Sequence, residues 1–490
     1  MEVNLSRNSI SNSQQNAANS AGRTVKEGGQ TGWIIATASL AFVVVQLDVT
    51  IVNVALPSIS ASLAAAVTAL QWVVDAYTLG FATLLLSASA ATDRFGSKHV
   101  FMAGFVGFAA ASLACGLAPN STFLNAARAL QGIGAAMLVP SSLAVLNTAC
   151  AHDSRLRARA VGIWTAAGGI SIAAGPVLGG LMLTAFRWRS IFLVNLPVCL
   201  LGIGLIWRFV PESPQTRKSG SFDFGGQLLV ILSLSGLIGA VIEVRSLGLA
   251  HPLVYGGIIL ALVAGAMFMA IETWAKTPMI PLSLFRRRGF GPAILFGALV
   301  NLSYYGVIFV LSLYLQKALG YSARQAGLAF IPLTATFILS NMASGWMTGR
   351  TGPRFPMVLG GLIGAFGYAL LSPLGAQATF LNMLPGFVLI PFGIGLGVPA
   401  MTTAILSSVD SSWAGTVSAL LNAARQTGGA IGVAAFGALL GGDLPDQIIA
   451  GLTTVTWSAA VLAGAAALIA FRISPSVQAG NEEVISSQCQ

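Results

Sequence analysis

The chain has 490 residues, of which 55% are hydrophobic and only 8% are charged, and its mean hydropathy is +0.81. A water-soluble domain carries about 25% charged residues, so this composition excludes a soluble globular protein and indicates a polytopic membrane protein. The net charge is +10, but the basic residues are dispersed in short loops between long apolar runs, which argues against nucleic-acid binding. The four cysteines and three histidines show no metal-ligand spacing, so neither a metal nor another cofactor is expected.

Fourteen apolar runs are long enough to cross a bilayer as helices, each of which needs about 20 residues. In chain order they cover residues 33–54, 71–91, 100–118, 123–146, 160–184, 190–210, 225–244, 253–272, 292–315, 325–348, 356–374, 380–406, 415–440 and 453–472. The polar residues 1–30, rich in Ser, Asn and Gln, are expected to form a disordered tail, and 473–490 a second tail. No cleavable signal precedes the first run, so that run is expected to stay in the membrane.

Most of the 25 Lys and Arg residues lie in alternate loops between these runs. Because Lys and Arg are enriched in cytoplasmic loops, the loops that carry them are expected on the inner side. An even number of spans then places both termini in the cytoplasm, and the plasma membrane is the expected location.

Two inner loops resemble each other and suggest an internal repeat. Arg94, Gly96 and Lys98 coincide with Arg350, Gly352 and Arg354 at one fixed offset. A weaker echo links Gly132-Ile-Gly134 to Gly393-Ile-Gly395. Repeated halves are common in transporters, with the substrate site between them near the midplane. The expected fold is therefore an all-α membrane protein with two pseudo-symmetric six-helix bundles (31–211 and 290–472) joined by a linker (212–289) that contains two extra spans.

Five stretches carry a resemblance to a known family. They are Leu47–Pro57 (LDVTIVNVALP), Asp93–Gly96 with Lys98, Arg128–Gly134, Gly175–Gly180 and Trp188–Pro197. Together they resemble the major facilitator superfamily, and within it the fourteen-span drug:proton antiporters. The chain departs from the family pattern at Ser89 and Ser171, where glycine is usual, and at Ser97-Lys98-His99, where the loop motif usually has more basic residues.

The resemblance implies a transporter and not an enzyme. Its expected activity is the proton-coupled export of amphiphilic or cationic small molecules by alternating access, with the proton gradient as energy source. The expected partners are therefore a small-molecule substrate, protons and membrane lipid. The sequence specifies no oligomeric state, and a monomer is compatible with it. The alternative is an exporter dedicated to one metabolite, such as a natural product or a siderophore. A phosphate-binding glycine loop with Lys-Ser/Thr is absent from the sequence, which argues against ATP as the energy source.

Asp48, Asp75 and Arg128 are charged residues inside or at the ends of apolar runs. A charge at the bilayer centre costs about 2.5 kcal/mol or more on insertion scales, so it normally faces a partner or a cavity. With a rise of about 1.5 Å per residue, all three reach a similar depth in the outer half of the first bundle. The hypothesis is that Arg128 tunes the proton affinity of Asp48 or Asp75. The alternatives are a polar packing contact for Asp48 and an interfacial position for Asp75.

The resemblance assigns Asp93, Arg94, Gly96 and Lys98 to a cytoplasmic gate. Physically, a carboxylate at this place can accept hydrogen bonds from a helix N-terminus or an arginine. The alternative is that this loop only supplies the positive charge that sets the topology.

Gly175, Pro176, Gly179 and Gly180 form the motif that the resemblance associates with antiporters. Small residues at this spacing predict close helix packing, and Pro176 predicts a bend because it lacks a backbone donor. Candidate residues for a substrate cavity are Gln46, Tyr77, Asn301, Tyr304 and Arg425, with Trp72 and Tyr305 beside them. For the aromatic residues, contact with lipid or with other helices is the alternative.

Overall fold

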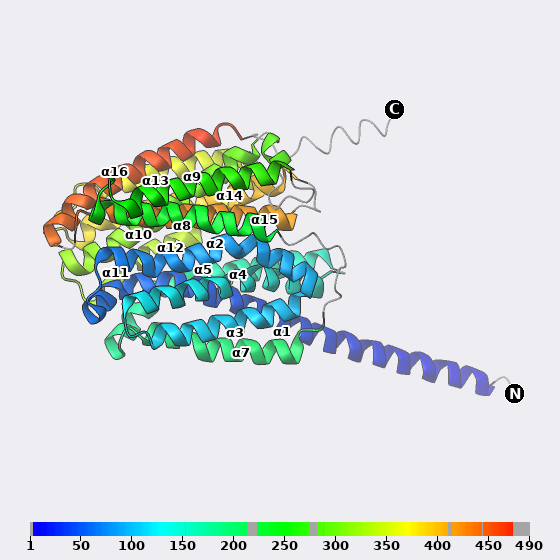
Figure 1. Cartoon of the computed structure of the whole chain (residues 1–490). Helices are drawn as coiled ribbons and strands as arrows, with labels where there is room; N and C mark the ends of the chain where they lie inside the picture. The colour runs from blue at the N-terminus through cyan, green and yellow to red at the C-terminus, as the bar shows by residue number, and fades with distance from the viewer. Residues whose placement is uncertain are drawn as a thin grey trace, which may run out of the picture.

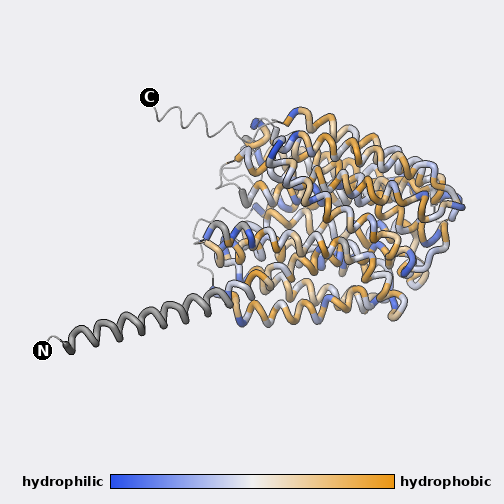
Figure 2. Tube along the Cα trace, turned by 180° about the vertical axis from the view of Figure 1, so that it is seen from behind, coloured by the Kyte–Doolittle hydropathy of each residue, from blue (hydrophilic) through white to orange (hydrophobic). Residues whose placement is uncertain are grey.

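The protein is a bundle of long helices that lie side by side (Figure 1). The computed structural model describes residues 30–151, 153–212, 223–274, 282–287, 289–409, 414–442 and 444–473. Along the helices the chain is mainly apolar, and the strongly hydrophilic segments lie mostly at the two ends of the bundle (Figure 2). Helices suit a membrane because they satisfy their backbone hydrogen bonds internally.

The first half of the bundle comprises helices α1 to α7. They are α1 (Val3–Leu63), whose side chains are described from Gln30 onward, α2 (Val67–Phe95), α3 (Ser97–Gly116), α4 (Ser121–Ala149), α5 (Ser154–Ala185), α6 (Ser190–Leu193) and α7 (Asn195–Phe209). The last two together make one apolar span from Ser190 to Phe209. Within this half α2 and α3 pack on α4, and α1 packs on α5.

A helix pair, which corresponds to the predicted two extra spans, lies between the two halves in the sequence. The pair is α8 (Phe224–Leu247) and α9 (Pro252–Trp274), and a short 3-10 helix η1 (Leu282–Arg286) comes next. The second half comprises α10 (Phe290–Leu313) with its π-helical extension η2 (Tyr314–Ala318), α11 (Ala323–Ala329), α12 (Ile331–Thr351), α13 (Arg354–Leu370), α14 (Phe380–Leu406), α15 (Ala414–Leu439) and α16 (Pro445–Ala470). Helix α2 joins the two halves, because it packs against α15 as well as α4, and α8 packs against both α2 and α15 (Figure 1).

Within the described residues, eleven helices are long and apolar enough to span a membrane, and the bent helix α5 makes up to twelve. Arg354–Leu370 is a shorter apolar helix. Each of the fourteen predicted ranges overlaps a helix, but the number of fourteen spans stays a prediction. The predicted tails lie almost wholly outside the residues whose side chains are described, as do residues 213–222 and 275–281 of the predicted linker.

The two loops that suggested an internal repeat have the same backbone turn. Gly96 separates α2 from α3 with φ +86°, and Gly352 follows α12, just before α13, with φ +74°. Both lie in the left-handed region, which favours glycine because a Cβ would clash there. Both arginines also lie near an aromatic ring, although at different positions in sequence: Arg94 lies 5.5 Å from the ring centroid of the next residue, Phe95, and Arg350 lies 4.0 Å from that of Trp346, one turn earlier. The sequence repeat is therefore also a repeat of turn geometry.

Replacing Gly96 by Ala is expected to lower stability, because a side chain in this backbone region costs about 1–3 kcal/mol. Gly107 is a matched control, since a Cβ added there in the middle of α3 meets no atom within 4 Å. The thermal unfolding midpoint of the purified protein should fall for Gly96→Ala and stay level or rise for Gly107→Ala. Equal midpoints for the two variants would contradict the strained-turn explanation.

Candidate functional site

A cluster of polar side chains lies in the interior of the first half. Arg128 of α4 forms an ion pair with Asp48 of α1, and their side chains are 1% and 0% exposed. The other Asp48 oxygen, Oδ1, accepts hydrogen bonds from Gln131 Nε2 at 2.9 Å and Asn195 Nδ2 at 3.0 Å. Ser112 of α3 completes the cluster, because its Oγ accepts a hydrogen bond from Gln131 Nε2 at 2.8 Å. The cluster therefore joins α1, α3, α4 and α7.

Arg128 is held by several contacts besides the ion pair. Its Nε donates to the Val73 carbonyl oxygen at 2.9 Å, and its Nη1 donates to Gln131 Oε1 at 2.7 Å. Its guanidinium also lies 4.3 Å from the ring centroid of Tyr77 and 5.6 Å from that of Phe192. A buried charge needs such a complete set of partners, because leaving it unpaired is costly. Gln131, Asn195 and Ser112 were not predicted as site residues, although each is a polar residue inside an apolar run.

Asp75 lies apart from this cluster. Its side chain is 0% exposed, and among the described residues neither carboxylate oxygen has a hydrogen-bond partner. Asp75 follows Gln71 by one helical turn, so the two side chains share a face of α2. Gln71 Nε2 donates to the Val433 and Ala434 carbonyl oxygens of α15 at 3.2 and 2.8 Å. The structure thus unites Asp48 with Arg128 and places Asp75 on the face of α2 that meets the second half.

The two halves are tied together at the end that the sequence predicts to face outward. The first contact consists of the hydrogen bonds from Gln71 to the Val433 and Ala434 carbonyl oxygens. Ser312 donates to the Asn53 carbonyl oxygen, and Gln316 Nε2 donates to that of Val54 at 3.0 Å. These contacts of Gln71, Ser312 and Gln316, here called the closing contacts, all run from a side chain to a backbone carbonyl of the opposite half. They close one end of the interface between the halves.

The glycine-rich motif of α5 also lies at this interface. Gly175 packs against Thr50 of α1, because an added Cβ would lie 1.9 Å from Thr50 Oγ1. Gly180 faces α11, and its added Cβ would lie 2.7 Å from the Ala323 carbonyl oxygen. The expectation of close packing is confirmed at both positions, and Gly179 packs on Ile51 in the same way. The bend expected from Pro176 is present as well, since α5 turns by 43° between residues 172 and 174, next to the carbonyl that loses its donor.

The predicted gate residues lie at the turn between α2 and α3. Asp93 and Arg94 are exposed, Lys98 is partly exposed and Gly96 is buried. The turn itself depends on Gly96, as described above. A gating role for these residues stays a prediction.

The five residues proposed for a substrate cavity occupy two regions. Tyr77 packs on Arg128, and its hydroxyl donates to the Val45 carbonyl oxygen at 3.3 Å, while Gln46 lies half-buried on α1. In the second half, Asn301 Nδ2 donates to the carbonyl oxygen of Gly297 at 2.8 Å.

Tyr304 and Arg425 are the other two of these residues. The ring of Tyr304 meets that of Tyr305 edge-on, with centroids 5.3 Å apart. The Nε of Arg425 is buried and has no hydrogen-bond partner among the described residues. None of the five predicted residues lines either of the two hollows described next, and their part in substrate binding stays a prediction.

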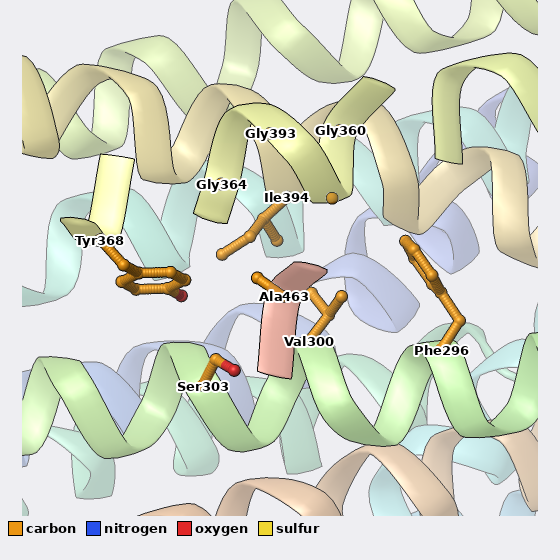
Figure 3. Close-up of a pocket in the computed structure, with 10 residues that line it drawn as sticks. Phe296, Val300, Ser303, Gly360, Gly364, Tyr368, Gly393, Ile394 and Ala463 are labelled. Atoms are coloured by element: carbon orange, nitrogen blue, oxygen red, sulfur yellow. The ribbon is translucent and has the colours of Figure 1, made fainter. Parts of the chain in front are cut away.

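A cavity of about 500 Å³ lies where α2, α8, α9, α10 and α15 meet. A much smaller hollow of about 10 Å³ lies inside the second half, among α10, α13, α14 and α16. Figure 3 shows the side chains of Tyr368 and Ser303 beside this small hollow, under the backbone of Gly364 and Gly393. Only the larger cavity has the volume of a typical small-molecule site, which is about 300–1,000 Å³.

Comparisons with known proteins agree with this architecture. Residues 38–433 match the family model described as Major Facilitator Superfamily. The Methylenomycin A resistance protein of Streptomyces coelicolor is 38% identical over 418 residues, which cover 84% of this chain and 86% of that protein. Multidrug resistance protein Stp of Mycobacterium tuberculosis is 36% identical over 407 residues, which cover 83% of this chain and 75% of that protein. A solved structure from a study of proton dependent oligopeptide transporters matches 89% of this chain and 97% of its own, with a TM-score of 0.64 and 15% identity, and so shares the fold.

Proposed function

The chain belongs to the Major Facilitator Superfamily, and from that premise we propose that it is a proton-coupled antiporter that exports amphiphilic or cationic small molecules, among them antibiotics. The observation that carries the proposal is the pair of buried acidic sites in helices at the interior, Asp48 with a full set of partners and Asp75 with none among the described residues. Two similar proteins are named for resistance to one antibiotic and to many drugs, which supports export of toxic compounds. The protein is proposed to have fourteen spans and both termini in the cytoplasm.

The proton is proposed to bind at Asp75. Asp48 is already neutralised by Arg128 and held by two amides, so its charge is balanced in this arrangement. Asp75 is fully buried on a face of α2 that meets the second half, where a change in the fit of the halves alters its surroundings. A buried carboxylate that lacks partners is costly, so Asp75 can couple a proton to the movement of the halves. Protonation would accompany one arrangement of the halves, and ionisation the other.

The closing contacts support alternating access in this proposal. They tie the outer ends of the two halves, so the described arrangement corresponds to a state closed to the outside. Export requires that these contacts break while the inner ends approach each other. Asp93, Arg94, Gly96 and Lys98 are proposed to act at those inner ends.

Transport into inside-out vesicles under an imposed pH gradient tests this function. Uptake of labelled antibiotics should rise when the vesicle interior is acidic and should collapse when an ionophore removes the gradient. Uptake that ignores the gradient would refute antiport. A panel of compounds distinguishes a multidrug exporter from the alternative, because an exporter dedicated to one metabolite should move one structural class alone.

The variant Asp75→Asn is expected to reduce gradient-driven uptake to the level of vesicles without a gradient. An amide cannot exchange a proton at this position, whereas the size of the side chain is preserved. Asp446→Asn is the matched control, since this acidic residue is exposed in the first turn of α16 and should transport normally. If Asp75→Asn retained full gradient-driven uptake, the proton site would have to be assigned elsewhere.

A further inference from the structure

The cavity of about 500 Å³ is built by three parts of the chain that are distant in sequence. Helix α2 comes from the first half, α10 and α15 come from the second half, and α8 and α9 are the inserted pair. Its lining residues on α2 and α15, such as Leu86 and Leu420, lie toward the ends opposite the closing contacts. In the proposed orientation the cavity therefore lies in the cytoplasmic half of the membrane.

The cavity walls are apolar. No charged side chain lines it, and the hydroxyl groups at its surface belong to Thr83, Ser233 and Thr427. Two of these are already engaged, because Thr83 Oγ1 donates to the Leu79 carbonyl oxygen at 2.7 Å and Ser233 Oγ donates to that of Ala261 at 2.9 Å. The walls therefore offer dispersion contacts and few hydrogen bonds, which selects against a charged or strongly hydrated ligand.

The inserted helices form a fixed wall of this cavity. Gly236 of α8 and Gly257 of α9 pack backbone to backbone, because a Cβ added at Gly236 would lie 2.7 Å from the Gly257 carbonyl oxygen. Gln227 attaches α8 to α2, since its Nε2 donates to the Thr83 carbonyl oxygen at 2.8 Å and its Oε1 accepts from Ser87. Helices α8 and α9 are thus anchored side by side at the seam between the halves.

Toward the outer side, the cavity ends at a cluster of buried apolar side chains. Ile238, Ile242, Ala430 and Ala434 form a buried cluster between α8 and α15, and Trp72, Leu79 and Ile431 pack against it. Ile431 also lines the cavity, so it connects the cluster to the cavity. Asp75 shares the face of α2 with Leu79 and Ala82, one and two helical turns away. A molecule in the cavity would therefore lie against the helix face that carries Asp75.

We propose that this cavity binds the uncharged apolar body of an amphiphilic molecule, such as an acyl chain or a fused-ring system, taken from the cytoplasmic half of the bilayer. This inference rests on the proposed function and specifies its substrate class. It also gives the inserted pair α8 and α9 a role, which is to supply one wall of a binding site outside the interior of either bundle. The uncharged walls match the uncharged part of such a molecule.

Photolabelling of the full chain in lipid nanodiscs tests the proposal with two probes. One probe is radiolabelled benzophenone, which is neutral and apolar, and the other is a phospholipid that carries a diazirine in its acyl chain. Benzophenone is expected to label the cavity-lining residues Leu234, Phe268 and Leu299 more strongly than the lipid-facing residue Leu262, which is 68% exposed. Labelled peptides are identified by mass spectrometry.

The variant Val230→Trp places a large ring in the cavity and should lower benzophenone labelling of the cavity residues about tenfold, the factor that corresponds to a binding loss of about 1.4 kcal/mol. Leu228→Trp is the matched control on the same helix, because Leu228 is 56% exposed and does not line the cavity. This variant should label like the unmodified protein. Ala423→Phe fills the cavity from α15 and should lower benzophenone labelling in the same way. Agreement between the two variants shows that the lower labelling does not result from misfolding of one of them.

The outcomes distinguish a free compound from a bilayer lipid as the ligand, and they distinguish failure of this proposal from failure of the proposed function. Labelling by benzophenone assigns the cavity to a free lipophilic compound, and labelling by the phospholipid alone assigns it to an acyl chain of the bilayer. Labelling of the cavity residues no stronger than that of Leu262 with both probes would overturn the proposal. Photolabelling needs no pH gradient, so it can succeed even if transport in vesicles proves independent of the gradient. In that case the binding site is supported and antiport is refuted. If transport follows the gradient but the cavity is not labelled, the binding site alone is refuted.

Discussion

Replacing Arg128 by Met is expected to abolish transport and to reduce the amount of folded protein in the membrane. The change removes the cation that pairs with Asp48 and leaves a carboxylate that is 0% exposed. Removing one partner of a buried ion pair costs about 3–5 kcal/mol, because the remaining charge is uncompensated. The loss should be larger than that caused by any exposed arginine, and Arg208→Met at the exposed end of α7 is the matched control with a small effect.

A double variant separates the structural from the functional contribution of the pair. Replacing both partners of a buried ion pair by apolar residues of similar size is often neutral for stability. Asp48→Leu with Arg128→Met should therefore recover folded protein, measured as the monodisperse fraction after purification, but should not recover gradient-driven uptake. If the double variant were as poorly folded as Arg128→Met alone, the uncompensated charge would not be the cause of the loss.

Replacing Gly180 by Val is expected to stop transport while the protein still folds. A Cβ at this position would lie 2.7 Å from the Ala323 carbonyl oxygen and 3.2 Å from Arg324 Cα. Because these atoms are backbone, they cannot rotate away, and α5 and α11 must move apart. Since these helices belong to opposite halves, the wider spacing should favour an outer end that stays open.

Gly169→Val is the matched control for this prediction. It lies on the same helix, and an added Cβ there meets no atom within 4 Å. Accessibility of a cysteine introduced at Asn53 to a membrane-impermeant maleimide reports the opening, and labelling should rise for Gly180→Val and remain low for Gly169→Val. A Gly180→Val protein with normal uptake and a protected Asn53 position would contradict the role of this contact in closure.

The sequence predicted the helices from simple physics, and it predicted that Arg128 acts on Asp48 or Asp75 without deciding between the two. Long apolar runs have few other solutions in a membrane, and two opposite charges at similar depth have a strong reason to meet. The depth argument failed to separate Asp75 from the pair, because depth along a helix does not give the direction in which a side chain points. Gln71 could have indicated the direction of Asp75, since it lies on the same face of α2 and its side chain donates a hydrogen bond to α15.

The large cavity could not be predicted from the sequence. Its walls are mainly Leu, Ala, Val and Gly residues from five helices, and such residues occur all over the bundle. Only their spatial arrangement leaves a space unfilled. The closing contacts were hidden for a related reason, because their acceptors are backbone carbonyls, which every residue carries.

The use of backbone acceptors in the closing contacts affects how the protein tolerates change over evolutionary time. Asn53, Val54, Val433 and Ala434 accept these hydrogen bonds through their backbone carbonyl oxygens. A substitution at any of these four positions keeps the acceptor, although the buried side chain must still fit its surroundings. The polar specificity of the contacts therefore depends on Gln71, Ser312 and Gln316. Each neutral hydrogen bond contributes about 1 kcal/mol, so the closing contacts are weak enough to break by thermal motion. The four acceptor positions can therefore accept substitutions that would break a contact if made at Gln71, Ser312 or Gln316.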